Sequence, residues 1–275
     1  MAFMRSTTIW KPLLWTLLIT NMQLPFFYSF KSEWLKTRHS LSSWLTICGA
    51  FFIPLIVLFQ RFYYAADSAA VNASPRVWQQ LYTDNWEYMA VLLLPMGVIL
   101  VSSLITQLEV KNNAWKLVHS TPQKLHIIFS AKLAVILVML LQFFVLFNIG
   151  ICLTALIPAV FNRHIPFPRQ AFPMMAYLRG SGQFFIACLP IVALQYLLSL
   201  QFRNFLVPVG AGLGLLTASI IAVKWKYGYI IPYIYGTLKF IGKQPAAALY
   251  TLPFSYFCGF TIASWLLYYY KKQKD

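Results

Sequence analysis

Long apolar windows dominate the chain, and charged residues bound each of them. Six windows are long enough to cross a hydrocarbon core of ~30 Å, which takes about 20 helical residues. They lie between His39 and Arg61, Glu87 and Glu109, Lys132 and Arg163, Arg179 and Arg203, Arg203 and Lys224, and Lys243 and Lys271. Strict alternation of apolar and polar residues is absent, so helices rather than a barrel must satisfy the backbone in lipid. The pattern predicts an all-α, polytopic membrane protein with six transmembrane helices.

A shorter amphipathic segment, residues 26–41, precedes the first window. Its apolar stripe consists of Phe26, Phe27, Phe30, Trp34 and Leu41, and its opposite face of Ser29, Ser32, Glu33 and Lys36. Lys31 and Arg38 border the stripe, where their stems can reach the lipid headgroups. We expect an N-terminal interfacial amphipathic helix that turns the chain into the first span. A frayed tail beside the membrane is the alternative.

Residues 1–25 form an extension whose role the sequence leaves open. Its apolar core is only eight residues long, which is short for a span, and no small-residue cleavage pattern follows it. The segment is either a real element or the result of a misplaced start codon, with Met22 as the true first residue.

Composition supports the membrane assignment, since 60% of the residues are hydrophobic and only 10% are charged. An average soluble domain has about 25% charged residues. The formal net charge of +16 comes from basic residues in short loops between spans. That distribution fits membrane topology better than nucleic-acid binding. More Lys and Arg fall on the side of the two termini, so the positive-inside rule predicts that both termini are cytoplasmic.

Two segments are then expected outside the membrane. Residues 61–87 form the most polar loop, and Asn72-Ala73-Ser74 within it matches the N-glycosylation acceptor pattern. Residues 224–243 interleave aromatic side chains with Gly and Pro. Aromatic rings prefer the membrane interface, so this second segment is expected to dip into or rest on the outer leaflet.

Motifs for catalysis and cofactors are missing from the sequence. Neither a phosphate-binding GxxxxGK[ST] loop nor HExxH occurs, and the chain holds only six acidic residues. Cys48, Cys152, Cys188 and Cys258 lie in apolar windows without a CxxC pair, as expected of buried small hydrophobic residues. The last four windows contain no ionisable residue, which disfavours an ion-coupled carrier. We expect no catalytic site, no metal and no cofactor.

The most informative segment is EVKNNAWKLVHSTP, from Glu109 to Pro122, between two of the most apolar stretches. Asn112 and Asn113 are good N-cap residues, and Thr121-Pro122 reads as a second cap followed by Pro at the first helical position. This pattern predicts a short helix, a bend and a second helix that leads into the third span. Trp115 has too few apolar neighbours in that helix to build a core, which favours burial against another protein.

At these residues the chain resembles the six-span permeases of type 2 ATP-binding-cassette exporters, especially the lantibiotic and bacitracin immunity branch. That branch carries E-x-K-N-N-T-W-K, then a Pro and a Lys that opens the next span. The matching residues are Glu109, Lys111, Asn112, Asn113, Trp115, Lys116, Pro122 and Lys132, while Ala114 stands in the place of the usual Thr. The segment Ser32 to Lys36 is also similar to the E-x-x-K element that precedes the first span in these permeases.

The resemblance covers the chain from about Met22 to its end, and we expect a single membrane permease domain over residues 1–275. It comprises the uncertain extension 1–25, the interfacial helix 26–41, a six-span bundle over 42–270 and a cytoplasmic coupling segment 109–132. A separate ABC ATPase would dock on the coupling segment, and a second permease copy or paralogue would complete the transporter. Localisation in a bacterial cytoplasmic membrane and export of a hydrophobic or peptide cargo follow from the same resemblance.

Two other functions stay open from the residues alone. The chain could be a membrane anchoring or assembly subunit of an ATPase-linked machine, or an ATPase-free secondary carrier. An adjacent gene that encodes a phosphate-binding loop would exclude the carrier.

Overall fold

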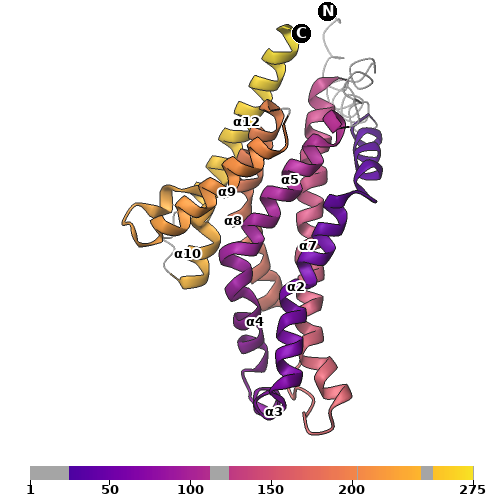
Figure 1. Cartoon of the computed structure of the whole chain (residues 1–275), viewed down its shortest axis with the longest axis vertical. Helices are drawn as coiled ribbons and strands as arrows, with labels where there is room; N and C mark the ends of the chain where they lie inside the picture. Colours follow the sequence, from indigo (N-terminus) through magenta and orange to yellow (C-terminus); the bar gives the residue numbers. More distant parts are fainter. Residues whose placement is uncertain (1–24, 112–123, 203, 243–249, 275) are drawn as a thin grey trace, which may run out of the picture.

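The computed structural model describes residues 25–111, 124–202, 204–242 and 250–274, and all regular structure in these ranges is helical (Figure 1). A helix over residues 25–37 comes first. The elements that follow are α2 (Leu41–Tyr63), α3 (Ala65–Ala73), α4 (Val77–Tyr88), the π-helical turn η1 (Met89–Leu93), α5 (Leu94–Lys111), α7 (Leu125–Phe161), α8 (Met174–Gln201), α9 (Leu206–Ile221), the 3₁₀ turns η2 (Ala222–Lys224), η3 (Gly228–Ile230) and η4 (Pro232–Ile234), α10 (Tyr235–Ile241) and α12 (Thr251–Lys274). The all-α prediction is confirmed.

Five helical stretches in the described ranges are long and apolar enough to cross a membrane, by length and composition. They are Leu41–Tyr63, Val77–Leu108, Leu125–Phe161, Met174–Gln201 and Leu206–Lys224. The sixth predicted window holds α12, a helix of 24 residues that packs along α8. Its Ser, Thr, Tyr and Pro residues make α12 less apolar than the other five. The chain is therefore an all-helical, polytopic membrane protein with five candidate spans, and the sixth span stays a prediction.

Residues 61–87, predicted as a polar loop, are mostly helical. They form α3 and α4, and α4 continues through η1 into α5. The loop prediction was wrong because the apolar positions of α4 sit among polar ones at helical spacing, and they are buried against α7 and η1. Helix α7 has 37 residues and so extends about 55 Å, well beyond a ~30 Å hydrocarbon core. Figure 1 places α3 and α4 at the end of the bundle away from the C-terminus.

A buried polar network ties that end together. Arg61 of α2 donates from Nη2 to Oδ1 of Asn72 at 2.5 Å. The side-chain amide of Asn72 donates to the carbonyl oxygens of Ala155, at 3.3 Å, and Pro166, at 2.9 Å. Asn72 is fully buried, so the acceptor tripeptide that begins at this residue is a packed structural element in the folded chain.

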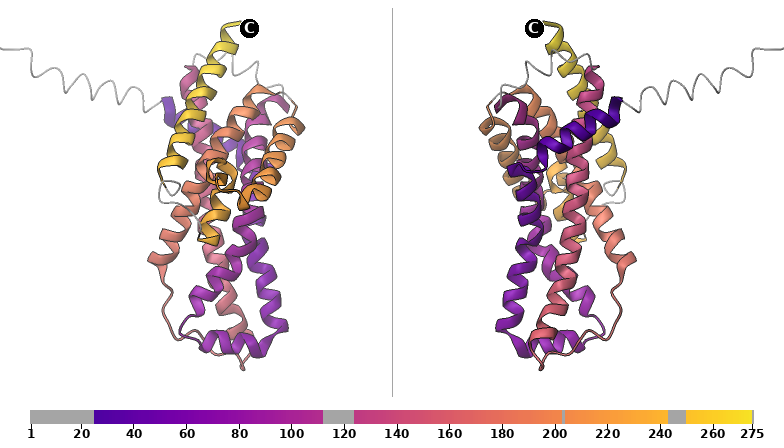
Figure 2. Two further views of the ribbon diagram at one scale, coloured as in Figure 1. Left: turned by 90° about the vertical axis from the view of Figure 1, so that its left-hand side faces the viewer. Right: turned by 90° about the vertical axis from the view of Figure 1, so that its right-hand side faces the viewer.

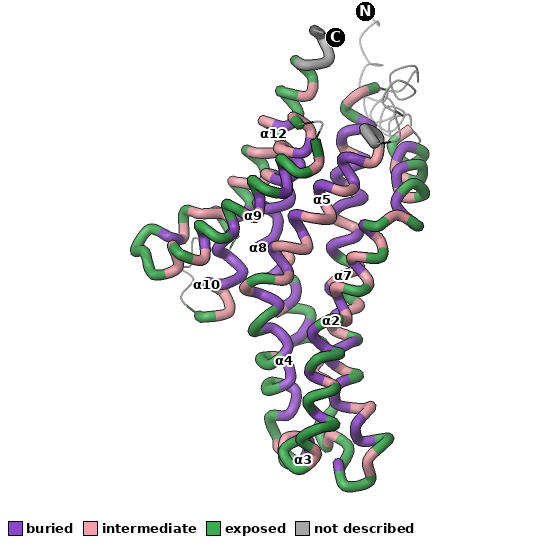
Figure 3. Tube along the Cα trace, in the orientation of Figure 1, coloured by how far each residue is buried: buried purple, intermediate pink, exposed green. Residues whose placement is uncertain are grey.

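The core between α4, α7 and α8 is built on aromatic rings. The ring of Trp86, which is fully buried, stacks on Phe184 with a centroid distance of 3.8 Å and an interplanar angle of 8°. The edge of Phe147 packs on the same indole at 5.0 Å. Buried residues run along the facing sides of α5, α7 and α8, as Figure 3 shows, whereas the outer sides of α3 and α9 are exposed.

Polar residues inside the spans bond across helix interfaces. Gln195 of α8 donates to Ser103 of α5 at 2.8 Å and to the carbonyl of Pro208 in α9 at 2.7 Å. Its Oε1 atom accepts from the hydroxyl of Tyr233 at 3.3 Å. One buried amide therefore joins α5, α8, α9 and η4.

The aromatic segment, described as far as residue 242, contains the end of η2, the two 3₁₀ turns η3 and η4, and α10. It lies beside α8 and η1 rather than beyond the end of the bundle (Figure 1). Tyr233 and Tyr235 are buried there, whereas Trp225 is exposed. A β-carbon on Gly236 would lie 3.0 Å from the carbonyl oxygen of Ala90, so this close approach requires glycine. The segment packs into the side of the bundle, and its contact with the outer leaflet stays a prediction.

Candidate functional site

The helix of residues 25–37 confirms that the segment before the first span is helical, but it ends before Leu41. Residues 38–40 form a turn, and Leu41 begins α2. The turn is closed by Ser40, whose N–H donates to the carbonyl of Thr37 at 3.0 Å and whose hydroxyl donates to the same carbonyl at 2.8 Å. Figure 2 shows this helix crossing the upper part of the bundle obliquely.

Burial on that helix differs from the sequence expectation. Ser29, Glu33 and Thr37 are buried at 4%, 6% and 1% exposure, whereas Phe26 and Phe27 are exposed. Phe30 and Trp34 are partly buried and pack against the core of the bundle. The predicted polar face is therefore divided, since Ser29 and Glu33 face the protein while Ser32 and Lys36 do not. The sequence pattern could not predict which polar residues face the protein, because an apolar residue of a membrane protein can face lipid as well as the core.

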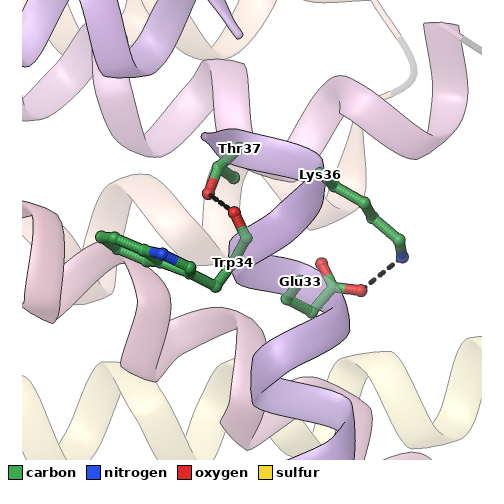
Figure 4. A network of polar contacts seen from close by, with 4 residues as sticks. All are labelled: Glu33, Trp34, Lys36 and Thr37. Carbon is green, nitrogen blue, oxygen red and sulfur yellow. Dashed lines mark hydrogen bonds and ion pairs between the residues drawn. The ribbon is translucent and has the colours of Figure 1, made fainter. Parts of the chain in front are cut away.

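Glu33 and Lys36, the acid and the base of the E-x-x-K element, form an ion pair one turn apart. Nζ of Lys36 lies 2.5 Å from Oε1 of Glu33, and the Glu33 side chain is the more buried partner (Figure 4). The hydroxyl of Thr37 donates to the carbonyl of Trp34 at 2.9 Å. Burial of a carboxylate is costly unless a cation compensates it, so the pair holds Glu33 in its buried position.

The predicted coupling segment lies between the end of α5 and the start of α7. Glu109 and Lys111 belong to the last turns of α5, and their side chains lie outside the described part of the chain. The other predicted partner residues also lie outside the described residues: Asn112, Asn113, Trp115, Lys116 and Pro122. The end of α5, the start of α7, the helix of residues 25–37 and the end of α12 all lie at one end of the bundle (Figure 1).

Polar contacts fix the two helices that flank this segment. Gln107 of α5 donates to the carbonyl of Phe202, just after α8, at 2.7 Å. Tyr196 of α8 donates to the carbonyl of Phe129 in α7 at 3.0 Å. Lys132, which matches the family pattern, is 5% exposed in α7. Both attachment points of the segment are therefore tied to α8, and a force on the segment would be passed to α5 and α7 together.

Metal chemistry has no site in the described ranges, where no group of three or more His, Cys, Asp or Glu residues could hold an ion. Cys188 is buried, as expected, but Cys48 and Cys258 are exposed. The sequence expectation was wrong for these two because an apolar helix position can face lipid rather than the core.

Sequence reasoning missed two hollows between α2 and the α4–η1–α5 stretch. The inner one has a volume of about 270 Å³ and an almost wholly apolar lining, which includes Cys48, Gly49 and Phe52 of α2. The outer one, of about 1240 Å³, is lined by Asp67, Asp84 and Glu87 together with apolar residues. A signal was present, since these are three of only six acidic residues and they fall within one short stretch of sequence.

The family model for ABC-2 family transporter proteins matches residues 29–236, about three quarters of the chain. The chain belongs to this family, and it is the permease membrane subunit of an ABC-2 type transporter. Membership implies association with an ABC ATPase, and membrane domains of this family are typically non-catalytic. No curated protein and no solved structure matches the chain.

Proposed function

We propose that the chain exports its cargo by coupling to a separate ABC ATPase that docks on residues 109–122. The family match over residues 29–236 carries this proposal. The position of the segment supports it, because α5 ends and α7 begins at the same end of the bundle as the end of α12. A rigid body bound there would act on two long helices at once, and one of them, α7, runs the full length of the bundle.

The finer features of the transporter belong to the same proposal. Both termini are cytoplasmic, α12 is the sixth span, and a second copy or a paralogue completes the complex in a bacterial cytoplasmic membrane. The E-x-K-N-N-x-W-K pattern supports the lantibiotic and bacitracin immunity branch and a hydrophobic or peptide cargo. The helix of residues 25–37 lies in the cytoplasmic interface, where its exposed Phe26, Phe27 and Leu35 contact lipid.

Co-reconstitution with the ATPase tests the proposal directly. The full chain would be purified with a candidate ABC ATPase, placed in lipid nanodiscs, and assayed for ATP hydrolysis. We expect a stable complex whose hydrolysis rate exceeds that of the ATPase alone. Failure of the two chains to associate, together with hydrolysis that does not depend on the permease, would overturn the proposal.

Cysteine labelling tests the topology separately. Ala70, exposed on α3, is a suitable outer position, and Ser120 is the inner one. Ser68 is unsuitable because it is 4% exposed and its hydroxyl donates to the carbonyl of Arg61 at 2.8 Å. A membrane-impermeant maleimide should label Cys at position 70 in intact cells and Cys at position 120 only after permeabilisation. Labelling of both in sealed cells would contradict the topology.

A further inference from the structure

The two hollows follow the same pair of helical segments and meet at Leu93, which lines both. The inner hollow faces residues 45–52 of α2, and the outer one lies along residues 53–61 of that helix and Tyr64 just after it. On the other side, both lie against the stretch that contains η1, and the inner one also faces residues of α7. We call these two adjoining hollows the α2–α5 groove. A π-helical turn at the junction is notable, since such turns occur frequently at functional sites.

The outer part of the α2–α5 groove carries a concentrated negative charge. Asp67, Asp84 and Glu87 line it, and Arg61 is the only basic residue among its lining residues. Arg61 is 6% exposed, donates to Asn72 and interacts electrostatically with Asp84, so it offsets part of the charge of the three carboxylates. No ion pair joins the three carboxylates to a cation within the described ranges. In a chain of net charge +16, this is a local reversal of sign that favours a cationic ligand.

The inner part of the groove has the opposite character. Apolar side chains make up nearly all of its lining, and its volume of about 270 Å³ is near the lower end for small-molecule sites, roughly 300–1,000 Å³. Ser102, which is fully buried, lines it, and the Ser102 hydroxyl has no hydrogen-bond partner among the described residues. An alkyl chain offers no hydrogen-bonding group to this hydroxyl, so only the apolar lining indicates the kind of ligand that the inner hollow can hold.

We propose that the α2–α5 groove binds a cationic amphipath, an ammonium group on a single alkyl chain, and that this is the chemical class of the cargo. The alkyl chain lies in the inner hollow beside Ser102, and the ammonium lies among Asp67, Asp84 and Glu87. This inference rests on the proposed function, because a site that runs between two candidate spans serves export only in a permease. The carboxylates of the outer hollow and the apolar lining of the inner hollow are needed together, since neither alone selects this ligand.

Photolabelling of the purified full chain in nanodiscs tests the site. The probe is a dodecyl-trimethylammonium compound with a diazirine near the end of the alkyl chain. Two matched probes carry a hydroxyl or a sulfonate in place of the ammonium. We expect the ammonium probe to label peptides of α2 and α5 that line the inner hollow, and unlabelled dodecyl-trimethylammonium to compete. Equal labelling by all three probes would mean that the groove holds any lipid chain, and would overturn the proposal.

Two pairs of variants connect the labelling to the charged rim. In the double variant Asp84→Asn/Glu87→Gln, about tenfold more unlabelled dodecyl-trimethylammonium should be needed for half-maximal competition. Each exposed charge pair contributes up to about fivefold in affinity. Gln80→Lys places a cation on the lining and should weaken it similarly. Gln79→Lys is the matched control, since Gln79 is exposed on the same helix but does not line the groove. Equal effects of the two lysine variants, or none from the acid variants, would overturn the assignment.

A second copy of the chain seated on the groove would exclude the probe altogether. No labelling of wild-type chain by the ammonium probe is therefore a result that contradicts the proposal. The ATPase is absent from these measurements, so their failure is separate from failure of the proposed function. A chain that associates with its ATPase but does not bind the ammonium probe would retain the coupling function and lose only the cargo assignment.

Discussion

Gly212 of α9 lies against the side-chain amide of Gln195 in α8, and a β-carbon at position 212 would lie 2.6 Å from Oε1 of that amide. It would also lie 2.8 Å from a methyl carbon of Ile99 in α5. Three helices therefore meet at one glycine, with the amide that bonds Ser103 and Pro208 at the centre. The absence of a side chain permits this packing, as is common at helix interfaces in membranes.

We expect Gly212→Ala to lower the unfolding temperature of the purified permease. Overpacking of a tight site costs about 1–3 kcal/mol, and here the methyl group would displace the bonded amide. Gly210→Ala and Gly214→Ala are matched controls, because a β-carbon at either position meets nothing within 4 Å. These controls should leave the unfolding temperature unchanged or slightly raised. An equal loss for all three variants would show that helix flexibility, rather than this contact, is important.

The Arg61–Asn72 contact predicts that substitutions at Asn72 and at Ser74 differ in their effect on stability. Asn72→Ala should destabilise the end of the bundle formed by α3 and α4, because it removes the acceptor of a buried guanidinium. A hydrogen bond to a charged group contributes about 1.5–3 kcal/mol. Ser74→Ala also destroys the N-glycosylation pattern Asn72-Ala73-Ser74, but it leaves the hydrogen-bond network of Asn72 intact. The Ser74 hydroxyl accepts a hydrogen bond from the N–H of Arg76 and not from that network. Urea titration should distinguish the two variants, and identical curves would contradict the role of Asn72.

The ion pair on the first helix predicts a local effect on protease sensitivity. Glu33→Gln removes the charge that holds Lys36, and we expect trypsin to cleave after Arg38 a few-fold faster. Loss of the ion pair should destabilise this helix by about 1 kcal/mol, which corresponds to roughly fivefold more of the locally unfolded form that trypsin cleaves. Ser32→Ala, at an exposed position beside Glu33, is the control. An unchanged cleavage rate in Glu33→Gln would mean that packing of Phe30 and Trp34 alone holds the helix.

Lys239 of α10 gives a prediction about pH. Its side chain donates to Oε1 of Gln183 and lies 5.4 Å from the ring centroid of Phe184. Burial lowers the pKa of Lys239 below its usual 10.5. The folded chain therefore binds fewer protons than the unfolded chain between the two pKa values, so the free energy of unfolding rises with pH in that window.

Lys239→Met should remove this rise. The variant is expected to be more stable than wild type at neutral pH, with a difference that shrinks as the pH approaches 10.5. Thermal unfolding at several pH values measures this directly. A wild type that is more stable than Lys239→Met at neutral pH would show that the contacts with Gln183 and Phe184 outweigh the cost of burial.

The spans could be predicted from the sequence because a hydrocarbon core demands long apolar helices, and charge-free windows mark them. Helix ends were less predictable. The helix that contains the second candidate span begins at Val77 rather than near Glu87, because α4 buries an amphipathic face and continues through η1. Charge-free windows show where a helix can enter lipid, but they do not show where the helix itself begins.

The candidate site was predicted in part for a related reason. The sequence placed Glu33 and Lys36 on one polar face, but it did not predict their ion pair, which the structure shows. It did not show that Glu33 faces the bundle, since lipid and core both accept apolar residues. The α2–α5 groove was hard to predict because its walls lie on separate helices and meet only in the fold, although its three acidic residues fall within one short stretch of sequence. Residues 112–123, which hold Trp115, are not described, so their role stays a prediction.

The most direct test of the account is retention of the ATPase by a Trp115→Ala permease. Loss of an interface tryptophan can cost ~2 kcal/mol or more, about thirtyfold in affinity. Trp225→Ala is the matched control, because Trp225 is exposed and follows η2. The stretch from η2 to α10 lies away from the ends of α5 and α7 (Figure 1). We expect Trp115→Ala to insert normally yet lose the ATPase on purification, while Trp225→Ala retains it. Co-purification of Trp115→Ala with the ATPase at wild-type stoichiometry, with normal hydrolysis, would contradict the coupling assignment.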